Sequence, residues 1–151
     1  MAGNLTLELH RQLPAPPSRV FEAFADSDRL ANWWGPEGFS IPRLRFGPAV
    51  GEAYRIEMQP PDGDAFHLAG EFTAVDPPRL LAFSFRWQPP DPDDVDNLVE
   101  LFFLDAGDTT ELALAQGPFK TEERRALHRD GWTDSLNKLE ALLSAGFENR
   151  A

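Results

Sequence analysis

Two hydrophobic periodicities, one following the other along the chain, constrain the fold most strongly. Between residues 39 and 116, apolar side chains recur at every second position, which is the period of half-buried β-strands. Turn-forming segments rich in Pro and Asp, at 60–63 and 76–79, separate successive strands and favour an antiparallel sheet. The alternating positions are Tyr54, Ile56 and Met58, then Phe66, Leu68, Gly70, Phe72 and Ala74, then Leu81, Phe83, Phe85 and Trp87.

From residue 121 the period changes to that of an α-helix. Thr121 is a suitable N-cap, and Glu122 and Glu123 place acidic side chains in the first turn. A curved sheet cannot bury its concave face alone, so we expect this helix to lie across that face. Apolar residues follow at helical spacing over about six turns. They are Leu127, Trp132, Leu136, Leu139 and Leu143.

The first forty residues predict one strand and two short helices. Residues 5–9 alternate between apolar and polar, which is typical of a half-buried strand. A helix over 18–24 follows Pro17, which is tolerated near a helix start. The segment 26–28 can end this helix and cap a second one over 29–34, which Gly35 and Pro36 stop. We therefore predict an α+β fold in which residues 1–151 form a single domain.

Composition disfavours several classes of protein and partner. The formal net charge of −11 argues against nucleic acid, because phosphate binding needs clustered Lys and Arg. The chain has no Cys, which excludes disulfides, thiolate metal sites and Cys nucleophiles. No stretch approaches the roughly 20 apolar residues of a membrane span, and the first residues lack a secretory pattern. We expect a cytoplasmic protein without membrane partners.

The residues that most often perform chemistry show no catalytic or metal-binding pattern. His10, His67 and His128 do not fall at metal-ligand spacing, and we expect each at the surface or an edge. No nucleophile elbow or phosphate-binding glycine loop occurs. The Pro-rich connection 88–97 carries carboxylates that we expect in solvent, namely Asp91, Asp93, Asp94 and Asp96. The sequence thus predicts no catalytic residue, no metal and no cofactor.

Aromatic residues are the strongest indication of a binding site. The segment 33–39 reads Trp-Trp-Gly-Pro-Glu-Gly-Phe, and such a surface is costly to leave in water. Gln116 continues the inward alternation of Leu112 and Leu114, so its polar group needs a partner, for which a buried water or a ligand group is a candidate. We predict an apolar cavity at one end of the sheet. Its candidate lining is Trp33, Trp34, Phe39, Tyr54, Ile56, Met58, Phe83, Phe85, Gln116, Trp132 and Leu136.

A nearly continuous apolar run at 98–104 places apolar side chains on both faces of one strand. The long helix can cover only one of these faces. We therefore expect that either the short N-terminal helices cover the other face or that it forms a homodimer contact.

Five segments carry a family resemblance that spans nearly the whole chain, at 14–23, 33–39, 61–63, 76–81 and 128–132. Together they resemble the branch of the START/polyketide cyclase/Bet v 1 (SRPBCC) superfamily that is similar to the activator of Hsp90 ATPase, here called AHSA1-like. The resemblance implies the helix-grip fold, a curved antiparallel sheet wrapped around a long C-terminal helix. It also implies a hydrophobic cavity between sheet and helix, of a kind used for lipids, polyketides or other apolar small molecules.

Two departures from the family pattern bear on function. Gly51 and Glu52 stand where relatives often have a Gly pair, and Gln116 stands where they often have His. The second departure lowers the expectation of catalysis. We therefore expect a binding protein for an apolar small molecule. The alternatives are an enzyme of the cyclase, hydrolase or lyase type acting on an apolar ring, and an interaction domain like the Hsp90 co-chaperone.

Overall fold

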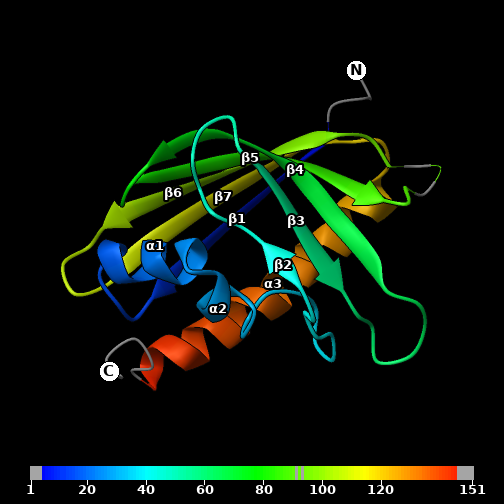
Figure 1. The fold of residues 1–151 in the computed structure, drawn as a ribbon. Helices are drawn as coiled ribbons and strands as arrows, with labels where there is room; N and C mark the ends of the chain where they lie inside the picture. Colours follow the sequence, from blue (N-terminus) through cyan, green and yellow to red (C-terminus); the bar gives the residue numbers. More distant parts are fainter. Residues whose placement is uncertain (1–4, 91, 93, 146–151) are drawn as a thin grey trace.

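The computed structural model describes residues 5–90, 92 and 94–145, which form a curved sheet, two short helices and a long helix (Figure 1). β1 (Leu5–Leu13) precedes α1 (Pro17–Ala25) and α2 (Ser27–Leu30). Six strands and the long helix follow in order. They are β2 (Leu44–Arg45), β3 (Ala53–Met58), β4 (Phe66–Asp76), β5 (Leu80–Gln88), β6 (Asn97–Asp105), β7 (Thr110–Phe119) and α3 (Glu122–Ser144).

The strands form one antiparallel sheet in the order β1-β7-β6-β5-β4-β3-β2. Consecutive strands from β2 to β7 are neighbours, whereas β1 pairs with β7 at the far edge. Figure 1 shows the sheet curving over α3, with α1 and α2 at one end. The predicted α+β helix-grip fold is confirmed. No helix in the described ranges is long and apolar enough to cross a membrane.

The capping predicted for α3 is confirmed, but the buried face of this helix differs from the predicted one. The Thr121 hydroxyl accepts from the backbone N–H of Arg124 at 3.1 Å, which fixes the first turn. Leu127, the predicted start of the apolar stripe, is 53% exposed. Its neighbour His128 is buried instead, so the prediction of a surface His128 is wrong. The buried face comprises His128, Trp132, Ser135, Leu136, Leu139 and Leu143.

The short helices close one end of the sheet and pack on its concave side. Asp26 caps α2 by accepting from the N–H groups of Asp28 and Arg29, so this helix begins at residue 27 rather than at the predicted 29. The helix also ends earlier than predicted, at residue 30. In α1, Phe21 and Phe24 pack on Phe103 of β6, with ring centroids 5.2 and 5.4 Å apart. The predicted first helix is confirmed.

An irregularity in β4 changes which residues face the core. The register between β4 and β5 shifts between Phe72 and Ala74, which leaves one extra residue on β4. Beyond this bulge the alternation is reversed, so Val75 pairs with the buried Leu81 and packs against the core. The sequence placed Ala74 on that face, and the bulge makes that prediction wrong.

The outer face of β6 remains uncovered in the single chain. Leu98, Phe102 and Leu104 are exposed there, whereas Val99, Leu101 and Phe103 point into the core. Because α1 packs on the inner face, the first of the two predicted alternatives, coverage of the outer face by the short helices, does not hold. The homodimer contact stays a prediction.

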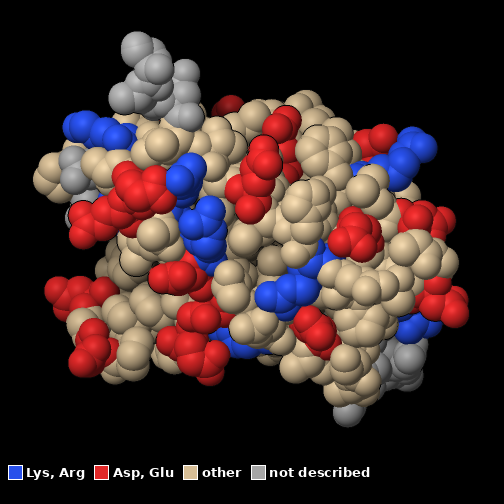
Figure 2. Space-filling view, turned by 180° about the vertical axis from the view of Figure 1, so that it is seen from behind, with Lys and Arg blue, Asp and Glu red and all other residues tan. Residues whose placement is uncertain are grey.

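Charged side chains are distributed over the surface in keeping with the acidic composition. Figure 2 shows acidic side chains spread over one face of the molecule, with basic side chains lying between them. Several arginines of the chain lie within ion-pairing distance of carboxylates, for example Arg11 with Glu140, which links β1 to α3 at 3.0 Å. Positive charge on the protein is therefore largely neutralised by neighbouring acids.

Candidate functional site

A cavity of about 410 Å³ lies between the first half of α3, the strands β3 to β5 and the segment 34–39. The strands contribute Met58, Phe66, Leu68, Phe85 and Trp87 to its lining. The helix contributes Arg124, Leu127, His128, Gly131, Trp132 and Ser135. The connecting segments contribute Trp34, Gly35, Pro36, Phe39, Pro89 and Asp94. The volume is within the range that accommodates a small organic ligand.

Aromatic rings in edge-to-face contact form the walls of the cavity. Trp34 and Trp132 meet at a centroid distance of 5.2 Å and an interplanar angle of 76°. On the strand side, Trp87 contacts Phe66 at 5.3 Å and Phe85 at 5.2 Å. Such contacts hold the rings in place beyond the effect of burial alone. The cavity therefore has walls suited to flat, apolar groups.

The aromatic segment is held against α3 by polar contacts that its sequence does not reveal. The N–H of Gly35 donates to the Ser135 hydroxyl at 2.9 Å, and the N–H of Glu37 donates to Asp134 at 3.1 Å. The backbone of Gly35 has a φ of +99°, which residues with a side chain rarely adopt, so a glycine is needed at this turn. One turn of α3 thus fixes the position of Trp34 at the cavity.

His128 sits in the cavity wall with both ring nitrogens engaged. Its Nδ1 lies 2.8 Å from the Arg124 carbonyl, and its Nε2 lies 3.0 Å from the Trp87 indole N–H. A carbonyl only accepts and an indole only donates, so the proton is on Nδ1 and the ring is neutral. Burial lowers the pKa of His128, as does the nearby Arg124 charge, while its bond to the Arg124 carbonyl and the Asp94 charge oppose them.

An ion pair lines the same end of the cavity. Arg124 Nη2 and Asp94 Oδ1 are 2.6 Å apart, and their side chains are only 17% and 9% exposed. The prediction that Asp94 lies in solvent is therefore wrong, because it meets the first turn of α3. Asp96 pairs with Arg86 in an exposed position, whereas Asp91 and Asp93 lie outside the described residues.

A protein-family comparison agrees with this architecture. The family model described as "Activator of Hsp90 ATPase homolog 1-like protein" matches residues 14–144. The chain belongs to this family.

Solved structures of bacterial proteins are similar to this AHSA1-like chain over most of its length. Protein CV1439 from Chromobacterium violaceum is 29% identical, with a TM-score of 0.83 over 91% of this chain and 95% of that one. The AHSA1 protein SPO3351 from Silicibacter pomeroyi is 28% identical, with a TM-score of 0.83 over 94% and 99%. A comparison with curated proteins gave no match.

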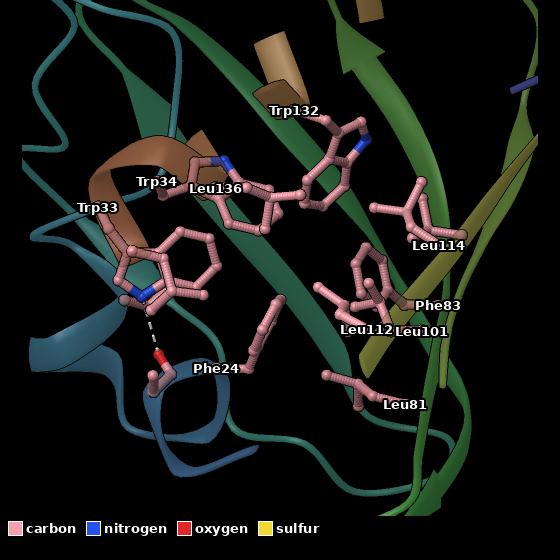
Figure 3. Close-up of a cluster of buried hydrophobic side chains, with 14 of the residues drawn as sticks. Phe24, Trp33, Trp34, Leu81, Phe83, Leu101, Leu112, Leu114, Trp132 and Leu136 are labelled. Carbon is pink, nitrogen blue, oxygen red and sulfur yellow. Dashed lines mark hydrogen bonds between the residues drawn. The ribbon is translucent and has the colours of Figure 1, made fainter. Parts of the chain in front are cut away.

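The structure of the AHSA1-like chain brings part of the predicted lining together at the cavity. Of the eleven candidates, the ones that line it are Trp34, Phe39, Met58, Phe85 and Trp132. Ile56, Phe83 and Leu136 are instead fully packed in the core, beside the cavity rather than around it. Figure 3 shows Leu136 close to Trp34 and Trp132, with Phe83 among the leucines of the sheet.

Trp33 faces away from the cavity, although the sequence predicts that both Trp33 and Trp34 line it. Its indole N–H donates to the carbonyl of Ala23 at 3.1 Å, the dashed bond in Figure 3, and its ring packs on Phe24. The side chain is fully buried. Trp33 therefore attaches the aromatic segment to α1, while Trp34 faces α3.

The partners of Gln116 are other side chains of the protein, rather than the buried water or ligand group that were the candidates from the sequence. Its side-chain oxygen accepts from the Trp132 indole N–H at 2.7 Å, and its amide N–H donates to Asn97 at 3.0 Å. The amide therefore orients Trp132 from behind. The prediction that Gln116 lines the cavity is wrong.

Tyr54 is also turned away from the cavity. Its ring packs among Phe46, Phe72 and Phe83, and its hydroxyl donates to the Ser84 carbonyl at 2.6 Å. Burial raises the pKa of Tyr54 well above its usual range, so the phenol stays protonated. It crosses Gly70 to reach Ser84, and a Cβ at Gly70 would lie 2.0 Å from that same carbonyl oxygen.

The cavity residues missed by the sequence analysis are Phe66, Leu68, Trp87, Arg124, Leu127 and His128, together with small and polar residues beside them. The alternation of β4 and β5 had already placed Phe66, Leu68 and Trp87 on the inward face, so this signal was available. The polar residues gave no signal, because their role depends on where α3 meets the sheet. No group of three His, Asp or Glu side chains within the described ranges is arranged to hold a metal ion.

Proposed function

We propose that this protein binds an apolar small molecule containing flat ring groups in the cavity between β3–β5 and α3. The supporting observation is the cavity itself, about 410 Å³ of space walled by Trp34, Phe85, Trp87 and Trp132. Transfer of apolar surface into such a space contributes about 25 cal/mol per Å² before ordering costs, so micromolar affinity is within reach. The proposal also agrees with the cavity implied by the family resemblance.

The charged and ionisable groups of the cavity, His128, Arg124 and Asp94, already have partners within the protein. His128 bonds to Trp87 and to the Arg124 carbonyl, and Arg124 pairs with Asp94. A buried polar group released from its partner costs free energy, so a ligand that leaves these contacts intact binds best. The preferred ligand therefore packs on the aromatic walls and presents little charge.

Binding can be tested with the neutral fused-ring probe 1-aminoanthracene, whose emission changes on transfer from water to an apolar site. We expect a saturable change with the parent protein. Met58→Trp should weaken it strongly, because the larger ring occupies the cavity. Phe102→Trp makes a comparable change on the exposed outer face and should leave binding unchanged.

Stability measurements on Met58→Trp decide between an open cavity and a filled core. A cavity accepts the indole with little loss of stability. Overpacking of a filled core typically costs about 1–3 kcal/mol. A loss of unfolding free energy above about 3 kcal/mol in Met58→Trp, the upper end of that range, would show that the space is already filled. Together with no saturable probe signal in the parent protein, this loss would rule out the proposal.

A second function, that of a protein-interaction domain, is favoured by one observation. The exposed Leu98, Phe102 and Leu104 form an apolar strip on the outer face of β6. Phe102→Glu separates the two functions. It should disrupt a protein interaction through this strip, and it should leave binding of 1-aminoanthracene in the cavity unchanged.

A further inference from the structure

A hollow of about 750 Å³ lies on the outer face of the sheet, on the side away from the cavity. Its floor is formed by small residues, Ala53, Ala69 and Gly70, and longer side chains stand around them. Three of these are arginines from three different strands, Arg45, Arg55 and Arg86. In a chain with a formal net charge of −11, this gathering of guanidinium groups needs a physical explanation.

The strand register places the three arginines in one row. Arg45 of β2 is directly opposite Arg55 of β3, Arg55 is opposite Ala69 of β4, and Ala69 is opposite Arg86 of β5. Arg55 and Arg86 are thus two strand spacings apart, roughly 10 Å. Since only the Ala69 methyl group stands between them, the space above it is open to a ligand.

Arg45 and Arg55 differ from the paired arginines of the protein. Ion pairs join carboxylates to Arg11, Arg29, Arg43, Arg79, Arg86, Arg124 and Arg125. Within the described part of the chain, Arg45 and Arg55 make no side-chain hydrogen bond or ion pair, although Glu71 also lines the hollow. Like charges directly opposite each other destabilise a strand pair. An anion between them would remove that repulsion.

Arg86 already has an ion-pair partner, Asp96, so it has fewer free donors for a ligand than Arg45 and Arg55. Its Nε and Nη2 donate to the two carboxylate oxygens of Asp96 at 3.1 and 2.8 Å. A guanidinium has five N–H donors, so three remain to face a ligand. The fork of N–H groups matches carboxylate and phosphate oxygens, and such charge-assisted pairs are strong.

We propose that this hollow is a binding site for a small oxyanion, a ligand bearing phosphate or carboxylate groups, held chiefly by Arg45 and Arg55. With three arginines and two acids, Glu71 and Asp96, the site carries too little positive charge for a nucleic-acid strand. The site is independent of the apolar cavity, because the two lie on opposite faces of the sheet.

The test is an NMR titration that follows the arginine Nε–Hε signals at constant ionic strength. Sodium pyrophosphate is the phosphate probe and sodium citrate is the carboxylate probe. We expect saturable shifts of the Arg45 and Arg55 signals with at least one probe, while the exposed Arg79 signal stays fixed. Saturation by one probe alone assigns the anion class. Saturation by neither overturns the proposal.

Two matched variants separate a site from general charge screening. Arg55→Gln should weaken anion binding by about tenfold or more, the effect of losing one charge-assisted pair. Arg79→Gln removes the same charge at the exposed β4–β5 turn and should leave affinity unchanged. Equal affinity in Arg55→Gln and the parent would overturn the proposal. Without anion, Arg55→Gln and Arg45→Gln should melt no lower than the parent, because each relieves repulsion.

Discussion

The indole N–H of Trp87 donates to Nε2 of His128 across 3.0 Å, joining β5 to the first turns of α3. This bond exists only while Nε2 carries no proton. Protonation would set two N–H donors against each other in the wall of the cavity. The pair therefore couples the protonation of one side chain to the contact between sheet and helix.

Stability should fall in mildly acidic solution because of this coupling. The folded-state pKa of His128 is lower than its ordinary value of 6.5, mainly because of burial. Above pH 6.5, His128 is neutral in both the folded and the unfolded state, so the stability that its buried neutral ring contributes is fully present. As the pH falls below it, the unfolded chain binds a proton that the folded one does not, so stability decreases until the folded-state pKa is reached.

Urea denaturation at a series of pH values measures this effect. We expect the unfolding free energy to decline below about pH 6.5 in the parent. The decline should be smaller in His128→Gln and retained in His67→Gln, which removes a histidine from the outer face. An identical slope in all three proteins would show that His128 does not control acid stability.

Two leucines on α3 provide a matched test of its buried face. Leu139 is fully buried, and Leu139→Ala should cost about 2–5 kcal/mol of unfolding free energy. Leu127 is more than half exposed, and Leu127→Ala should change stability by no more than about 0.5 kcal/mol. Thermal or urea unfolding of both variants gives the answer. Similar losses would mean that the helix is rotated from the orientation described.

Ser135 should contribute stability through the aromatic segment. Ser135→Ala leaves the Gly35 N–H without its acceptor in a buried position, at a cost of about 1–3 kcal/mol. It should also weaken the 1-aminoanthracene signal, because Trp34 loses its anchor. Ser144→Ala, an exposed position near the end of the same helix, is the control and should change neither measurement.

The outer strip on β6 predicts self-association. A homodimer formed through Leu98, Phe102 and Leu104 should appear by light scattering, and Phe102→Glu should convert it to a monomer. A parent protein that scatters as a monomer at high concentration would contradict this prediction.

Strand alternation in the sequence was enough to predict most of the sheet. Tyr54, Ile56, Met58, Phe83 and Phe85 all point inward as expected, because each strand has one buried face and turn residues mark its ends. Strand alternation mispredicts the inward residues beyond the β4 bulge, because one extra residue reverses the alternation without any change in composition. The family segments supplied the rest of the fold.

The site was harder to predict because polar residues belong to the buried face of α3. His128 and Ser135 complete that face, but a hydrophobic pattern does not count polar residues and therefore predicts a stripe that begins at Leu127. Likewise, adjacent tryptophans at 33 and 34 look alike in sequence. Only the positions of the Ala23 carbonyl and of Trp132 decide that one is core and the other faces the cavity.

The pairing of β1 with β7 determines when the fold can be completed during synthesis. Every other strand has a partner close in sequence, but β1 must wait until residues 110–119 have left the ribosome. Until then its apolar side chains, Leu7 among them, have no sheet to join. Contacts this distant in sequence form slowly. On the nascent chain, β1 therefore stays unpaired until β7 has been made, and the sheet closes at this edge last.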